Sequence, residues 1–192
     1  MLENLPKKLD SHWIKKNGVW DIVAYGSYAR GKSSSRDLDL AVILCKKTSV
    51  NIKWQLSQEL KNKIVHTDKT FDVKVIDIKD LLNPGFLGRE AILAEGYSII
   101  HRDYLAERFG FEAVALVAYS LSKISPAKQK TVYYALQGRV KGTGILSKLG
   151  GTILSGGILQ VPTRHYEEIA SLLEQHHISY KTTFLLQYRV LH

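Results

Sequence analysis

Apolar residues in the first half of the chain occur in short runs and in one long periodic stretch. The run from Val19 to Tyr25 is rich in β-branched residues, which is typical of a buried strand. Apolar residues recur every fourth position from Ile52 to Ile64, which predicts a helix. The expected elements, in order, are a helix at 2–17, strands at 19–25 and 38–44, a helix at 48–64, a strand at 70–78, a helical turn at 80–83, a helix at 88–95 and a strand at 97–101.

The pattern changes after residue 104. Ser125 and Pro126 have the residue types of an N-cap and a first helical position, so a helix is expected to start there. The stretch 141–161 is rich in glycine, and its short apolar runs predict a hairpin with a tight turn. The expected elements are helices at 111–123 and 126–138, hairpin strands at 152–154 and 158–161, a helix at 162–176 and a strand at 179–190.

Two aspartates stand at the start of the second apolar strand. Asp37 and Asp39 are two positions apart, so in a strand both point to one face, with Cα atoms roughly 6.6 Å apart. Two like charges this close repel, which raises the pKa of one carboxyl group unless a cation lies between them. A hard divalent ion with oxygen ligands, Mg²⁺ before Ca²⁺, is the ion this pair would attract.

A glycine and a serine end the strand before these aspartates. Gly26 permits a close approach of backbone and unusual dihedral angles, and Ser27 offers a hydroxyl group. Residues 27–31 are enough for about one helical turn, and backbone N–H groups at a helix start attract phosphate. The bend therefore predicts a phosphate site next to the two carboxylates.

The segments 26–31 and 37–40 together form the pattern G-S-x-A-R-G followed by D-L-D-L. This pattern resembles that of the nucleotidyltransferase superfamily, the DNA polymerase β-like fold, in its minimal nucleotidyltransferase branch. The chain departs from the commonest form in two respects. The linker between the two segments is one residue shorter, and Arg36 stands where the family usually has a small residue. The resemblance covers about residues 1–103.

The resemblance implies a third catalytic acid near the start of the strand beside the aspartate pair. Asp72 matches that place, and the alternative, Asp77, falls five residues later at the far end of the strand, where a turn or a helix cap explains it. Asp37, Asp39 and Asp72 are thus the expected catalytic residues and the ligands of Mg²⁺, with Mn²⁺ as a possible substitute.

The same resemblance implies where the nucleotide binds. It assigns this role to Gly26, Ser27 and Arg30. Arg36, which departs from the family pattern, is added as a nucleotide-binding residue for its charge, with Lys32 as a weaker candidate. The glycine and serine would hold the β and γ phosphates, and the cations would neutralise charge that develops on them.

The resemblance also implies the fold class, which is α+β. Residues 1–103 are expected to form a nucleotidyltransferase domain, a mixed sheet with flanking helices. Residues 104–192 match no family pattern that we recognise and are expected to form a small C-terminal α+β module. That module would bind the acceptor or nucleic acid, or would make the protein a homo-oligomer.

The amino-acid composition limits the class of partner and the cellular compartment that we expect. The 27 Lys and Arg against 18 Asp and Glu give a net charge of +9, which suits an NTP or a nucleic acid as partner. The single cysteine excludes an internal disulfide and suits a reducing cytoplasm. No apolar run is long enough for a membrane span, and the N-terminus lacks the apolar region of a secretory signal, so we expect a cytoplasmic protein.

The leading hypothesis from the sequence is a nucleotidyltransferase. It would move a nucleoside monophosphate from an NTP to a hydroxyl acceptor by two-metal catalysis and release pyrophosphate. The acceptor and the preferred base stay open, since RNA, protein and small molecules all carry hydroxyl groups. The alternative is a non-catalytic or antitoxin-like regulatory protein that binds nucleic acid or a partner protein on the same scaffold.

Overall fold

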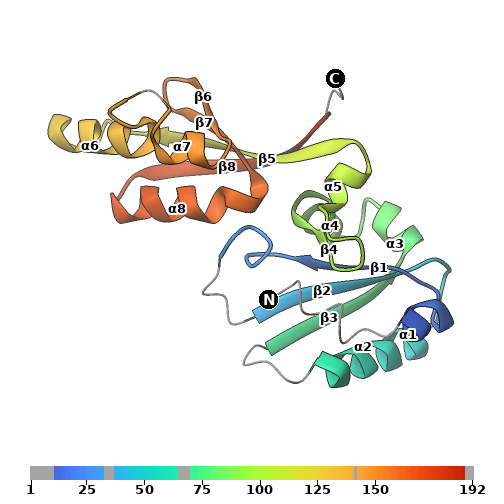
Figure 1. The fold of residues 1–192 in the computed structure, drawn as a ribbon. Coiled ribbons are helices and arrows are strands. Elements are labelled where there is room, and N and C mark those ends of the chain that lie inside the picture. Colours follow the sequence, from blue (N-terminus) through green and yellow to red (C-terminus); the bar gives the residue numbers. More distant parts are fainter. Residues whose placement is uncertain (1–10, 33–36, 65–69, 141, 189–192) are drawn as a thin grey trace. The chain divides into compact units, whose positions relative to one another are not determined.

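The computed structural model describes residues 11–32, 37–64, 70–140 and 142–188. Contacts divide the chain into two units, Met1–Phe109 and Gly110–His192 (Figure 1). Each unit has its own sheet and its own hydrophobic core, so each is described by itself. None of the helices in the described ranges combines the length and apolarity needed to cross a membrane.

The first unit is built on a four-stranded mixed sheet. Its strand order is β3-β2-β1-β4, in which β2 and β3 run parallel and the other neighbours run antiparallel. The predicted mixed sheet with flanking helices is therefore confirmed. The strands are β1 (Val19–Tyr25), β2 (Asp37–Leu44), β3 (Thr70–Asp77) and β4 (Tyr97–Ser98).

Alternate residues of β2 pack into two different cores. Leu38, Leu40, Val42 and Leu44 contribute to a core with side chains of α1 and α2. Ala41 and Ile43 lie in a second core on the opposite face, with side chains from α3, α4 and α5. In Figure 1 the two groups of helices accordingly lie on opposite sides of this sheet. The helices are α1 (Ser11–Lys16), α2 (Val50–Ile64), α3 (Ile78–Leu82), α4 (Arg89–Glu95) and α5 (Leu105–Arg108).

The second unit is a four-stranded antiparallel sheet with helices. Its strand order is β6-β7-β5-β8, and its core joins the sheet to α6 and α8. The hairpin expected in the glycine-rich stretch is confirmed as β6 and β7. The elements are β5 (Phe111–Ser120), α6 (Pro126–Gln137), α7 (Ile145–Lys148), β6 (Thr152–Ser155), β7 (Ile158–Pro162), η3 (Thr163–His165), α8 (Tyr166–Gln175) and β8 (Ser179–Tyr188).

One predicted element was wrong, and another is shorter than predicted. The helix expected at 111–123 is instead strand β5, the central strand that pairs with both β7 and β8. Its alanines favour a helix, but ladder hydrogen bonds on both edges outweigh that local preference. The strand expected at 97–101 ends at Ser98, because Ser98 N donates to Asp103 O and Arg102 adopts a left-handed conformation, with φ of 62°.

Asp77 joins the end of β3 to the start of α3. Its carboxylate accepts hydrogen bonds from the backbone of Lys79 and Asp80 and caps the helix. Lys53 of α2 donates to both Asp77, at 3.0 Å, and Asp80, at 2.6 Å. Burial alone would raise the pKa of Asp77, but the hydrogen bond from Lys53 and the capped amides lower it below the usual 3.8.

The Asp77→Ala variant should therefore lose about 2 kcal/mol of stability at neutral pH, because it removes the cap and one of the two carboxylates that pair with Lys53. A lowered pKa means that the folded state favours the carboxylate, so this contribution is full above about pH 4 and disappears on further acidification. Urea unfolding from pH 7 to pH 3 measures it. Asp77→Asn keeps a capping oxygen and should lose less; wild-type stability in both variants would contradict this account.

Candidate functional site

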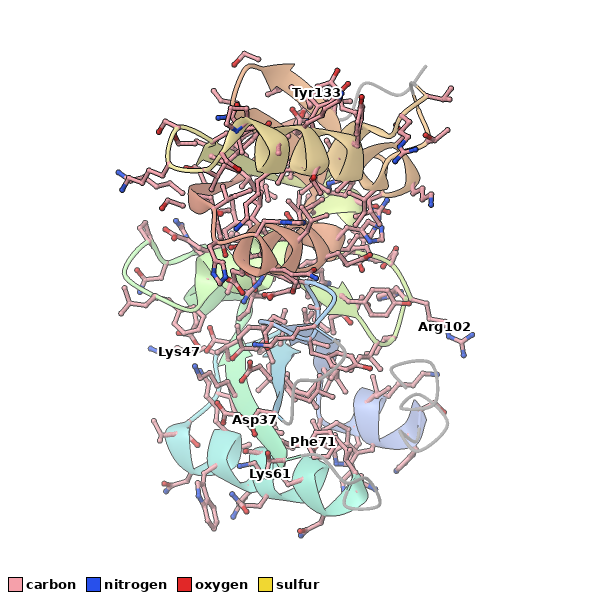
Figure 2. The ribbon with its side chains drawn as sticks, turned by 90° about the vertical axis from the view of Figure 1, so that its left-hand side faces the viewer. Asp37, Lys47, Lys61, Phe71, Arg102 and Tyr133 are labelled. Atoms are coloured by element: carbon pink, nitrogen blue, oxygen red, sulfur yellow. The ribbon has the colours of Figure 1, made fainter. Side chains whose placement is uncertain are left out.

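The register between β2 and β3 places three aspartates on one face of the sheet. Asp39 pairs with Asp72 across the parallel strands, and Asp37 pairs with Thr70 two positions earlier. Adjacent strands lie about 4.8 Å apart, so the backbones at Asp39 and Asp72 are close neighbours. Ala41 and Ile43 belong to the same face of the sheet as the aspartates. The aspartates lie at the end of this face where β2 begins (Figure 2 labels Asp37 on β2 and Phe71 on β3).

The electrostatics around Asp39 follow from this placement. Burial raises the pKa of its carboxyl group, and the charges of Asp72 and Asp37 raise it further, whereas Lys74 and Arg30 oppose the rise. The site thus concentrates negative charge against a partly buried surface. This is the condition that a bound cation relieves.

Tyr25 lies on the neighbouring strand opposite Asp39. Its hydroxyl oxygen is buried and has no hydrogen-bond partner among the described residues. Burial raises its pKa to about 12, and the charges of Asp39 and Asp72 add to the rise. The phenol therefore stays protonated at neutral pH beside the two carboxylates. The sequence analysis did not single out this tyrosine, because it reads as the last apolar residue of a strand.

Gly26 follows Tyr25 and lies against the carboxylate of Asp39. Its φ of +78° falls in the left-handed region, and a Cβ atom there would overlap Asp39 Oδ2. Both observations require glycine at this position. The next residues form turns, with hydrogen bonds from Arg30 N to Gly26 O at 3.2 Å and from Lys32 N to Ser27 O at 3.0 Å, and the described residues of this segment form no regular helix. The bend thus brings Ser27 into the vicinity of the aspartates.

Glu95 fixes this bend from the end of α4. Its side chain is 7% exposed, and its Oε2 accepts hydrogen bonds from Gly26 N at 3.1 Å and from Arg30 Nη1 at 2.9 Å. One carboxylate therefore holds both ends of the turn. The sequence analysis missed Glu95, since nothing about a glutamate before a helix-ending glycine indicates a contact with residues almost seventy positions earlier.

The remaining candidates are placed as follows. Arg30 is engaged with Glu95, and Lys32 is exposed just after the turn. Arg36 lies outside the described residues. Asp77, the alternative third acid, is the cap of α3 at the other end of β3 from Asp72.

The aspartates offer oxygen donors to a metal ion, but the described residues do not form a complete coordination sphere. In the part of the chain that the structure describes, no three His, Cys, Asp or Glu side chains are grouped tightly enough to hold an ion. The three aspartates share a face and a strand end, and burial together with the charges of Asp72 and Asp37 raises the pKa of Asp39. Carboxylate oxygens are the donors that Mg²⁺ and Mn²⁺ prefer, so the residues present fit such an ion by type and by charge.

Comparison with known proteins identifies the family of this chain. The family model described as "Polymerase beta, Nucleotidyltransferase" matches residues 7–105, just over half of the chain. A comparison with curated protein sequences finds no match.

Several solved structures are distantly similar. A toxin–antitoxin structure with AMP-PNP is 22% identical, with a TM-score of 0.37 over 52% of this chain and 73% of that chain. The toxin–antitoxin MntA-HepT is 19% identical, with a TM-score of 0.32 over 51% and 68%. A tri-AMPylated Shewanella oneidensis HEPN toxin in complex with an MNT antitoxin is 19% identical, with a TM-score of 0.31 over 51% and 67%. Likenesses this low carry no inference about this chain.

Replacing Asp39 by Asn should stabilise the protein in the absence of divalent ions. A raised pKa means that the folded state disfavours the carboxylate, so stability falls as the pH rises through the usual value of 3.8 and then through the folded value. We expect the melting temperature of Asp39→Asn to exceed that of the wild type by about 1–2 °C at pH 7, with no difference below about pH 3.8. Thermal melts in EDTA provide the measurement.

The exposed Glu90→Gln variant on α4 is the control, because it removes one exposed negative charge from the same unit. A wild type that melts above Asp39→Asn at neutral pH in EDTA would show that the three carboxylates do not repel as described.

Proposed function

We propose that this chain, which belongs to the polymerase beta nucleotidyltransferase family, transfers a nucleoside monophosphate from an NTP to a hydroxyl acceptor and releases pyrophosphate. The observation that carries the proposal is the register that sets Asp39 beside Asp72, with Asp37 on the same face. A scaffold that only binds a partner has no physical reason to keep three repelling carboxylates together.

Asp37, Asp39 and Asp72 would hold two Mg²⁺ ions, or Mn²⁺ in their place. Such ions supply charge neutralisation for the triphosphate and a lowered pKa for the attacking hydroxyl group. Asp72 is an exposed residue of β3, so an incoming acceptor could reach its carboxylate. We assign to it the orientation of the acceptor hydroxyl and the acceptance of its proton.

The bend after β1 would receive the β and γ phosphates. Gly26 contributes room, because its own N–H is already bound to Glu95 and its missing side chain leaves space beside Asp39. The hydroxyl of Ser27 would donate to a phosphate oxygen. Arg30, held by Glu95 at the other end of the turn, and Arg36 would neutralise charge on the leaving pyrophosphate.

Asp37→Asn and Asp39→Asn should each reduce Mg²⁺-dependent transfer by at least about 100-fold, because stabilisation by a bound metal is worth several kcal/mol and 1.36 kcal/mol equals a factor of ten. The protein would be incubated with each labelled NTP, Mg²⁺ or Mn²⁺ and a cell extract. Label on RNA, protein or a small molecule identifies the acceptor, and released pyrophosphate gives the rate.

Glu90→Gln serves as the matched control, since it loses one acidic charge on the exposed surface of the same unit. Its rate should equal that of the wild type. Wild-type rates in both aspartate variants with the identified acceptor would refute the proposed mechanism. Nucleic-acid binding without turnover of any NTP would refute the proposed activity.

A further inference from the structure

A second chemically distinctive feature of the first unit lies at the opposite end of β2 from the aspartates. A pocket of about 620 Å³ is formed by the end of α1, the turn into β1, the loop after β2 and the start of α2. Asp37 opens β2 and Leu44 closes it, which separates the two ends by about 23 Å at 3.3 Å per residue. The pocket is therefore separate from the proposed transfer site.

Four lysines line this pocket and give it its charge. Lys15 and Lys16 come from the last turn of α1, and Lys46 and Lys47 come from the loop after β2; all four are exposed. None of the residues that line the pocket in the described chain is acidic. Two separate segments thus bring cations to one concave surface, where they repel one another unless an anion is bound.

The backbone around the pocket adds to the positive electrostatic potential of the lysines. Ser49 O accepts from Lys53 N at 3.0 Å, so α2 starts at the pocket wall. This 15-residue helix has no acidic residue in its first turn, and the positive end of its dipole faces the same region. Cys45 N donates to Gly18 O at 2.9 Å, which ties the loop after β2 to the turn after α1. The walls that carry the lysines are therefore fixed relative to each other.

We propose that this pocket binds the phosphodiester backbone of a nucleic acid. Lysine is a compact point charge that contacts phosphate without reading sequence. A nucleic acid carries closely spaced phosphates and releases a counterion for each phosphate that a lysine neutralises. For a single strand at 0.1 M salt, this release raises the affinity about fivefold per lysine. An exposed ion pair between a lysine and a protein carboxylate contributes little binding free energy. The same four lysines should therefore bind an acidic peptide more weakly than a nucleic acid.

The lining also specifies the mode of binding. No aromatic residue is among the residues that line the pocket, and its apolar floor is made of aliphatic side chains such as Leu44, Ile52 and Leu56. Base stacking therefore has no platform here, in contrast to sites that hold single strands through their bases. We expect contact with the backbone alone, little sequence preference and a strong dependence on salt.

The test measures binding of a fluorescein-labelled single-stranded RNA of about 15 nucleotides to the full chain by anisotropy, over a range of salt concentrations. Lys46→Gln with Lys47→Gln should weaken binding about 25-fold at 0.1 M salt and reduce the slope of log K against log salt by about 1.4. The control pair is Lys61→Gln with Lys63→Gln, in the last turn of α2. It removes the same charge from the other end of that helix (Figure 2 labels Lys47 and Lys61).

The single cysteine supplies a local readout. Cys45 is exposed and lines the pocket, so bound RNA should slow its reaction with a thiol reagent several-fold. Tripolyphosphate and poly-glutamate, at equal concentration of charge, should protect it less than RNA. Better protection by tripolyphosphate would assign the pocket to a free phosphate compound, and better protection by poly-glutamate to an acidic protein; either result overturns the proposal.

Equal losses of RNA binding in the two lysine pairs, or no RNA binding by the wild type at 0.1 M salt, would also overturn it. The assay contains neither NTP nor divalent ion, so its result does not depend on the proposed transfer reaction. A protein can pass either test and fail the other.

Discussion

Electrostatic repulsion between Asp39 and Asp72 is the constraint around which the first unit is arranged. The parallel ladder between β2 and β3 holds the two residues opposite each other, so the repulsion cannot be relieved by moving the backbone. A slip of one residue would separate them, but it would also turn Leu38 and Leu40 out of their core. Apolar packing on one face therefore enforces the unfavourable charge arrangement on the other.

The bend beside the carboxylates depends on a contact from much later in the chain. Gly26 fits only because it has no side chain, and it is held in place by Glu95, which also binds Arg30. Charge-assisted hydrogen bonds to one buried acceptor are stronger than neutral ones, so they hold the turn firmly in its shape beside Asp39. The helices on this face thus serve the site as well as the core.

How much of this could be predicted depends on the range of the interactions. The strands around Asp37 and Asp39 and the break at Gly26 are local patterns, and the mixed sheet of the first unit was predicted from them and from the family resemblance they carry. Glu95 was missed because its partners are remote in sequence. Strand β5 was mistaken for a helix because Ala113, Ala115 and Ala118 favour a helix locally, and pairing with β7 and β8 outweighs that preference.

The contact from Glu95 has a consequence for how the protein is made. The three aspartates are synthesised well before α4, so a growing chain can form β2 and β3 while the bend after β1 still lacks its partner. The bend then gains its anchor only when the end of α4 has left the ribosome. A chain truncated before that point would carry all three aspartates and yet have an unanchored bend after β1.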